Sequence, residues 1–216
     1  MEINKPKKRL QRRIPVTSLS QILSGEKSCE YSLWFNSRYT CESNVKNLYS
    51  GYSPSDGKDK DPTSAHSKLV KNTAEFIKYY NKTILKERQF WYETGSGLFI
   101  IGRPDLITIT YHDELRIYEC KSKGESPSDK KQAALYSHYL PFVFNGYKKA
   151  NGFVVYEDRT EVLFSNDLDD TLEELKSVIK MLDSNKQPKK IKYDLECESC
   201  KLNYNDCQEK SKAIPA

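Results

Sequence analysis

Long apolar runs are missing from this sequence of 216 residues. A transmembrane helix needs roughly 20 consecutive apolar residues, and no stretch of the chain approaches that length. The basic N-terminal stretch, MEINKPKKRLQRR, also lacks the apolar segment that a secretory signal requires. We therefore expect a soluble, cytoplasmic protein that has no membrane partner.

Internal repeats and helicase motifs are absent as well, so we expect a chain that acts alone or as a subunit. Its length fits one domain, and a hydrophobic content of 37% is enough for one core. The formal net charge of +5 is modest, and Lys-rich stretches such as KPKKRLQRR and KQPKKIK carry much of it. Such stretches suit a phosphate backbone, and they serve equally well as solubility features.

Hydrophobic periodicity divides the chain into helices and strands. A polar loop is expected over residues 42–62, which are rich in Ser, Gly, Asp and Lys. Helices are expected over 15–39 in two pieces, over 63–88, over 128–144 with a disturbance at Pro141, and over 167–184. Strands are expected near 88–93, 98–102, 105–110, 115–121, 151–158 and 160–166. This order predicts a mixed α/β or α+β domain.

Three charged residues interrupt the apolar pattern of the hairpin GRPDLITITYHDELRIYECKSKG, residues 102–124. They are Asp105, Glu119 and Lys121, and burying such charges is costly unless they are paired or bound to a metal. Glu119 and Lys121 point to the same face of their strand, about 6–7 Å apart, while Cys120 points to the other face. The pattern is compatible with a surface ladder of salt bridges and with a functional site.

The length of the turn decides which residue faces Asp105. A two-residue turn at His112 and Asp113 would pair Asp105 with Cys120, whereas a three-residue connection or a bulge would bring it beside Glu119 or Lys121. Two carboxylates opposite each other stand about 5 Å apart and repel unless a cation lies between them. Oxygen ligands of this kind suit Mg²⁺ or Mn²⁺, and the lysine could then orient or activate a water.

The following helix adds Gln132 and Tyr136, which are four residues apart and share a face. Together, GRPD, YECK and QAALY resemble the PD-(D/E)xK nuclease superfamily in its RecB-like branch. The resemblance implies a restriction-endonuclease-like core, a central mixed sheet flanked by helices. It also implies one metal-dependent active site, in which a helix histidine, matched here by His66, is a further ligand. The catalytic residues that it implies are Asp105, Glu119, Lys121, Gln132 and Tyr136.

Three of the six cysteines crowd into CESCKLNYNDC as C-x2-C-x6-C. Thiolates suit zinc or an iron–sulfur cluster, and both usually take four ligands, so the fourth must come from a distant part of the chain. Cys29 and Cys41 are both available near the N-terminus. A zinc site and disulfide bridges are alternatives to the cluster.

One N-terminal cysteine before an aromatic-rich helix, with three cysteines after the nuclease motifs, resembles the CRISPR-associated RecB-like exonuclease family of the Cas-four type. The resemblance covers roughly residues 16–210, and the sequence leaves open whether this chain is a divergent, virus- or plasmid-borne relative outside any CRISPR locus. It implies that both chain ends form an iron–sulfur-stapled subdomain, from residues 15–41 and 186–210, within a single nuclease domain over 15–216 that follows a basic tail over 1–14. Cys41 matches no family ligand, and the carbonyl of Cys120 would face the active-site metal. The implied ligands of a [4Fe–4S] cluster are Cys29, Cys197, Cys200 and Cys207.

The sequence therefore predicts a Mg²⁺- or Mn²⁺-dependent deoxyribonuclease that hydrolyses phosphodiester bonds of single-stranded DNA or DNA ends. Exonuclease and endonuclease action both remain open, and so does a role in antiviral defence, recombination or viral replication. The partners that the family implies, besides DNA, are further copies of the chain or CRISPR adaptation proteins. The alternatives are a catalytically weak DNA-end-binding subunit of an adaptation or recombination complex, and a structural iron–sulfur or zinc protein.

Overall fold

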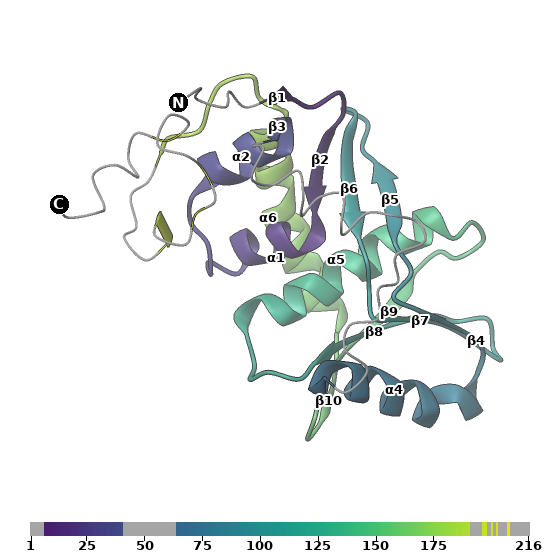
Figure 1. Ribbon diagram of the computed structural model, residues 1–216. Helices are drawn as coiled ribbons and strands as arrows, with labels where there is room; N and C mark the ends of the chain where they lie inside the picture. The colour runs from purple at the N-terminus through teal and green to yellow at the C-terminus, as the bar shows by residue number, and fades with distance from the viewer. Residues whose placement is uncertain are drawn as a thin grey trace.

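The computed structural model describes residues 7–40 and 64–190, together with Glu196, Cys197, Cys200, Leu202 and Cys207 (Figure 1). The expected loop over residues 42–62 lies outside the described residues, and Cys41 does too. No helix among the described residues has the length and apolar character needed to cross a bilayer.

A five-stranded sheet forms the base of the fold, in the order β10–β9–β8–β7–β4. Only β8 and β9 run parallel within it, so the sheet is mixed. A three-stranded sheet, β2–β6–β5, is mixed as well, because β2 is parallel to β6 and β5 is antiparallel to it. A short pair, β1 and β3, is antiparallel. The strands are β1 (Lys7–Lys8), β2 (Arg12–Pro15), β3 (Tyr39–Thr40), β4 (Asn81–Lys86), β5 (Phe90–Glu93), β6 (Leu98–Gly102), β7 (Leu106–Thr110), β8 (Leu115–Lys121), β9 (Ala150–Tyr156) and β10 (Thr160–Val162).

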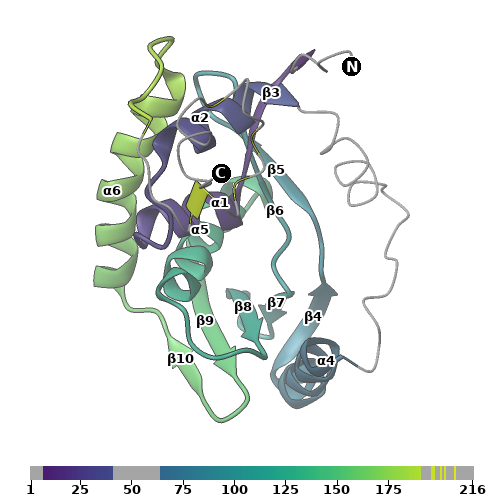
Figure 2. The same cartoon turned by 60° about the vertical axis from the view of Figure 1, so that its left-hand side comes forward.

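Helices cover both faces of the five-stranded sheet, which gives the described chain a mixed α/β architecture. The helix α4 lies against one face and α5 against the other (Figure 1). The remaining helices α1, α2 and α6 gather beside α5 and the three-stranded sheet (Figure 2). The helices are α1 (Val16–Leu23), α2 (Glu30–Arg38), α4 (Ala65–Ile77), α5 (Pro127–Val143) and α6 (Ser165–Asp183), and a 3-10 turn η1 (Lys78–Tyr80) follows α4.

The alternation of side chains along β8 separates two cores. Ile117 belongs to the larger core, which α1, α2, α5 and α6 share. Tyr118 and Cys120 point the other way and pack with Val70 and Ala74 of α4. Glu119 and Lys121 follow the parity of Ile117, so they face α5, as the period of two along a strand requires.

The long helix expected over residues 63–88 is wrong in its second half. The helix ends at Ile77, and residues 81–86 form the edge strand β4, which pairs antiparallel with β7. Asn81 marks the change, because its side-chain amide donates to the carbonyl of Ile77 at 2.7 Å. The β-branched Thr83 and Ile84 then join the sheet, whose ladder satisfies the backbone better than an exposed helix end would.

The basic N-terminal stretch takes part in the sheets from Lys7 onward. Arg9 donates to the carbonyls of Asn36 and Tyr39, and Arg12 pairs with Asp183 at 3.2 Å. These two arginines therefore tie the N-terminus to α2 and α6. The sequence did not predict the strands β1 and β2.

Candidate active site

The hairpin of β7 and β8 has the register that places Asp105 opposite Glu119. The pairs Leu106–Tyr118 and Ile107–Ile117 fix this register, and it continues one residue further to the two acids. A three-residue connection, residues 111–113, produces it, since the N–H of Thr110 donates to the carbonyl of Glu114 at 3.0 Å. The last residue of the connection, Asp113, has a φ of +62°, as such loops require. The sequence allowed a two-residue turn or a three-residue connection, and the structure has the three-residue connection.

Asp105 is buried, and both of its carboxylate oxygens have a partner. Oδ2 accepts the backbone N–H of Cys120 at 2.8 Å, and Oδ1 lies 3.1 Å from Nε2 of His66. His66 is in the first turn of α4, whose N-terminus is fixed by Ser64 accepting the N–H of Ser67 at 3.1 Å. The structure therefore brings the predicted histidine to the predicted acid.

Glu87 is a third possible ligand beside this pair, and the sequence did not identify it. Single ligand atoms of His66, Glu87 and Asp105 all lie within 4.8 Å of one another. Glu87 follows β4, its backbone N–H donates to the carbonyl of Asp105 at 2.8 Å, and its φ of +46° is unusual for a residue other than glycine. A left-handed residue at such a position is consistent with strain kept at a functional site.

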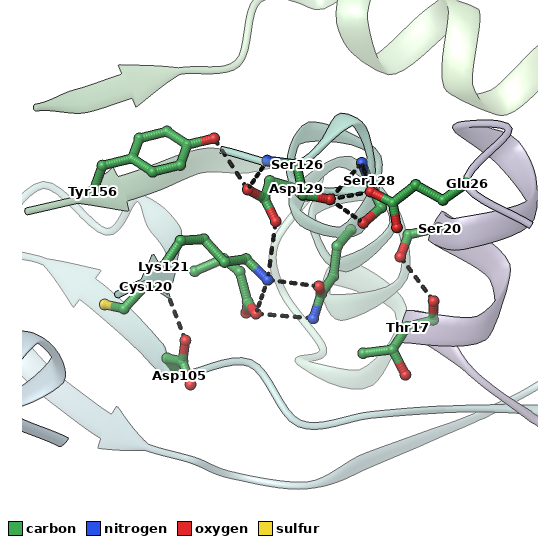
Figure 3. Close-up of polar contacts among 12 residues, drawn as sticks. Thr17, Ser20, Glu26, Asp105, Cys120, Lys121, Ser126, Ser128, Asp129 and Tyr156 are labelled. Carbon is green, nitrogen blue, oxygen red and sulfur yellow. Dashed lines mark hydrogen bonds and ion pairs between the residues drawn. The ribbon is translucent and has the colours of Figure 1, made fainter. Parts of the chain in front are cut away.

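Glu119, Lys121 and Gln132 form one hydrogen-bonded group, centred on the Lys121 side chain that Figure 3 labels. Oε1 of Glu119 accepts from Nε2 of Gln132 at 2.8 Å and lies 3.1 Å from Nζ of Lys121. The amide oxygen of Gln132 accepts from the same Nζ at 2.9 Å, and its nitrogen also lies 3.2 Å from the hydroxyl of Tyr136. Gln132 thus orients Lys121, and the buried Tyr136 supports Gln132 from behind.

The second carboxylate oxygen of Glu119, Oε2, is buried and has no hydrogen-bond partner among the residues that the structure describes. An unsatisfied buried oxygen of this kind is costly and calls for an ion or a water. Burial, followed by the charge of Asp105, raises the pKa of Glu119 to about 8. A divalent cation at this place would satisfy the free oxygen and offset both negative charges. In the described part of the chain, the ligand atoms that lie within 4.8 Å of one another are those of His66, Glu87 and Asp105, and Glu119 is not among them.

Lys121 keeps its positive charge in this environment. Burial lowers its pKa, but the carboxylates of Glu119 and Asp129 raise it more, and the net shift is upward. Its Nζ lies 3.4 Å from Oδ1 of Asp129, a buried residue in the first turn of α5. The site therefore holds a lysine that donates hydrogen bonds, between two acids and an amide.

The GRPD motif begins with a glycine, Gly102, at a position that has no room for a side chain. A Cβ atom built on it would lie 2.3 Å from the ring of Phe90 and 2.6 Å from the ring of Tyr136. The end of β6 can therefore approach α5 only without a side chain. This close approach keeps Tyr136 under the site.

The thiol of Cys120 does not face the site. Its Sγ lies 3.8 Å from the hydroxyl of Thr73 on α4, and burial raises its pKa to about 12, so a thiolate is disfavoured. Its backbone N–H points toward Asp105. The carbonyl of an extended residue points to the same strand edge as its N–H, so we expect it to point toward Asp105 too. That it faces a metal stays a prediction.

A cavity of about 610 Å³ opens onto these residues. Its walls come from the start of α1, from α4, from the β6–β7 connection, from the end of β8 and from α5. Two exposed cationic residues, Arg103 and Lys123, also line it. An anionic chain could therefore reach Glu119 and Lys121 from solvent.

The four cysteines expected to bind a cluster lie in the part of the chain where both ends meet. The carboxylate of Glu196 accepts the backbone N–H groups of Ser28 and Cys29 at 3.0 and 3.2 Å. Cys207 is buried in the larger core, and Cys29 and Cys200 pack against that core. Cys197 and Cys207 are buried, and Cys29 and Cys200 are partly buried. Thiolates are the ligands of iron–sulfur clusters and of structural zinc. Among the described residues, however, the ligand atoms that lie within 4.8 Å of one another are those of His66, Glu87 and Asp105, so these thiols are not gathered at the spacing of a zinc site.

Asp129 is a second residue near the site that the sequence analysis did not identify, although the sequence contains a pattern that predicts its position. Ser126 and Asp129 have the spacing of a capping box, and the structure shows both of its hydrogen bonds at the start of α5. Glu87 carries no comparable signal, because its stretch has the composition of a helix and a left-handed glutamate cannot be recognised from its neighbours.

Comparisons with known proteins add little. No family model matches the chain, and no curated protein matches it either. Among solved structures, one titled "Crystal structure of SSO0001" is similar, with a TM-score of 0.46 and 18% identity over 96% of this chain and 88% of the other. A likeness at that level carries no argument about function.

Proposed function

We propose that the protein is a metal-dependent deoxyribonuclease of the PD-(D/E)xK type. The observation that carries the proposal is the buried Oε2 of Glu119, which has no hydrogen-bond partner among the described residues. This oxygen belongs to the acid opposite Asp105 and beside a lysine that an amide holds in place. A salt-bridge ladder would lie on the surface, whereas both acids are buried.

Asp105 and Glu119 would hold Mg²⁺ or Mn²⁺, and His66 would add a nitrogen ligand. The carboxylate of Glu87 and the backbone of Cys120 also lie close to Asp105. The ion would polarise the phosphate and lower the pKa of a bound water.

Lys121 then orients the attacking water and stabilises the charge that develops on the phosphate oxygens. The water oxygen forms a bond to phosphorus, the phosphorus–oxygen ester bond breaks, and the products are a phosphate monoester and an alcohol. Gln132 fixes the direction of the lysine. The attacking water loses a proton to solvent, and the leaving oxygen takes a proton from solvent to become the alcohol.

The substrate class follows from the cavity. It is open and is lined by Arg103 and Lys123, which suits a polyanion. Single-stranded DNA or a DNA end reaches such a cleft more easily than an intact duplex does. We propose these as the preferred substrates.

A [4Fe–4S] cluster on Cys29, Cys197, Cys200 and Cys207 is a separate part of the proposal. Its support is the contact of Glu196 with the N-terminal segment, which brings donors from both ends of the chain into one region. Protein purified without oxygen should be brown and contain four iron atoms per chain, on the stoichiometry of such a cluster. Colourless protein that contains zinc would agree with the same four cysteine ligands but would refute the iron–sulfur cluster.

The decisive experiment is cleavage of end-labelled single- and double-stranded DNA with Mn²⁺, with Mg²⁺ and with EDTA. Lys121→Ala should retain the fold and Mn²⁺ binding but lose on the order of a hundredfold in rate. Lys176→Ala is the matched control, because that lysine is exposed on α6 and should leave the rate unchanged. If Lys121→Ala cleaves as fast as the parent at saturating Mn²⁺, the proposed mechanism is wrong.

A further inference from the structure

Lys121 has three acceptors at its ammonium group, and the family motifs account for only two of them. The oxygens lie at 2.9 Å on Gln132, at 3.1 Å on Glu119 and at 3.4 Å on Asp129. The contact with Gln132 is a hydrogen bond, and the contacts with the two carboxylates are ion pairs. The third acceptor, Asp129, is a buried carboxylate that has no place in the mechanism above.

Asp129 is held firmly by its other oxygen. Oδ2 accepts the backbone N–H of Ser126 at 2.9 Å, which closes the capping box of α5, and it also accepts the hydroxyl of Tyr156 at 3.3 Å (Figure 3). The start of a helix favours a negative charge, so the carboxylate is stabilised there. Oδ1 is thereby directed at Lys121 by two contacts that come from β9 and from the connection before α5.

A metal ion changes the balance of charge around the lysine. Once Glu119 donates to a cation, its charge is shared, and its attraction for Lys121 weakens. Gln132 is neutral and offers only a hydrogen bond. Asp129 is then the anion that remains at full charge beside the ammonium.

We propose that Asp129 is a positioning residue that keeps Lys121 directed at the reaction centre while Glu119 binds the metal. This inference rests on the proposed nuclease function. Asp129 touches neither the metal nor the substrate, and it acts only through the lysine. Ser126, the N-cap of α5, therefore has a second effect, because its backbone N–H fixes the Asp129 carboxylate that holds Lys121.

Asp129→Asn separates the two roles of the residue. The asparagine oxygen can still accept from Ser126 and Tyr156, so the cap is kept, but an N–H₂ group now faces Lys121. We expect kcat for single-stranded DNA to fall about tenfold to a hundredfold, the scale of a misplaced catalytic group. The KM for DNA, the Mn²⁺ concentration for half-maximal rate and the thermal midpoint should stay unchanged.

Two further variants make the test specific. Tyr156→Phe removes a contact to Oδ2 only and should keep most of the rate. In a Lys121→Ala background, Asp129→Asn should cause no further loss, because residues that act through one another are not additive.

An equal loss in both backgrounds, or a loss that follows the thermal midpoint or the Mn²⁺ requirement, would show that Asp129 is only a helix cap and would overturn the inference. An unchanged kcat in Asp129→Asn would overturn it too, while leaving the nuclease function intact. Absence of metal-dependent cleavage by the parent protein is a different result, which refutes the proposed function and the inference with it.

Discussion

Glu119 should make the stability of the metal-free protein depend on pH, and Glu119→Gln should remove that dependence. Burial, followed by the charge of Asp105, raises the pKa of Glu119 from an ordinary 4.5 to about 8. Between these values the folded protein holds a proton that the unfolded chain has released. The contribution of this group to stability is therefore complete below pH 4.5 and is lost as the pH rises through 8.

One proton of difference lowers the free energy of unfolding by about 1.4 kcal/mol for each pH unit within this window. Glutamine keeps an oxygen for Gln132 and Lys121 and does not titrate. The parent should therefore lose stability between pH 5 and pH 8 more steeply than Glu119→Gln, with a difference in slope that approaches this value. Urea unfolding followed by tryptophan fluorescence, in EDTA at several pH values, measures it.

A matched control is Glu173→Gln, which alters an exposed acid on α6 and should leave the slope of the parent unchanged. Mn²⁺ should oppose the effect, because it binds the deprotonated carboxylate. Its apparent affinity should rise about tenfold per pH unit below pH 8. Equal slopes for the parent and Glu119→Gln would refute the reasoning and would mean that the carboxylate is charged and satisfied without a metal.

Three other predictions concern the frame of the site, the cysteines and the cavity. Gly102→Ala should lower the free energy of unfolding in urea by about 1–3 kcal/mol, because its Cβ would meet the ring of Phe90. An unchanged urea midpoint would show that the rings move aside freely. Cys197→Ser should lower the visible absorption and iron content of protein purified without oxygen, whereas Cys41→Ser should keep both. Lys123→Ala should weaken DNA binding and reduce the slope of log affinity against log salt by about 1, measured by fluorescence anisotropy. An equal slope in the variant and the parent would show that Lys123 does not contact the DNA.

Most of the candidate site could be predicted from local sequence. Period-two alternation put Glu119 and Lys121 on one face and Cys120 on the other, and the structure shows this arrangement. Helical spacing put Gln132 and Tyr136 on one face, and they meet at 3.2 Å. Such calculations succeed because they depend only on the backbone geometry of a single element.

The edge strand β4 could not be predicted in the same way. Residues 81–86 follow the helical pattern with no glycine or proline to end it, and they form a strand because β7 offers them a ladder of hydrogen bonds. That preference comes from a partner far along the chain, so no window on the sequence contains it. Glu87 was missed for the same reason, since its place beside Asp105 exists only once β4 and β7 are paired.

The sequence by itself therefore determined which side chains the candidate site contains: two acids, a lysine, an amide and a histidine at spacings that elements of regular geometry convert into shared faces. The tertiary structure decided how these faces meet. The three-residue connection at 111–113 set Asp105 opposite Glu119, α4 brought His66 to Asp105, and the cap of α5 turned Asp129 toward Lys121. Periodicity is a property of one element and can be read along the chain, whereas register, docking and burial are properties of two elements in contact, and they are fixed only when the whole domain packs.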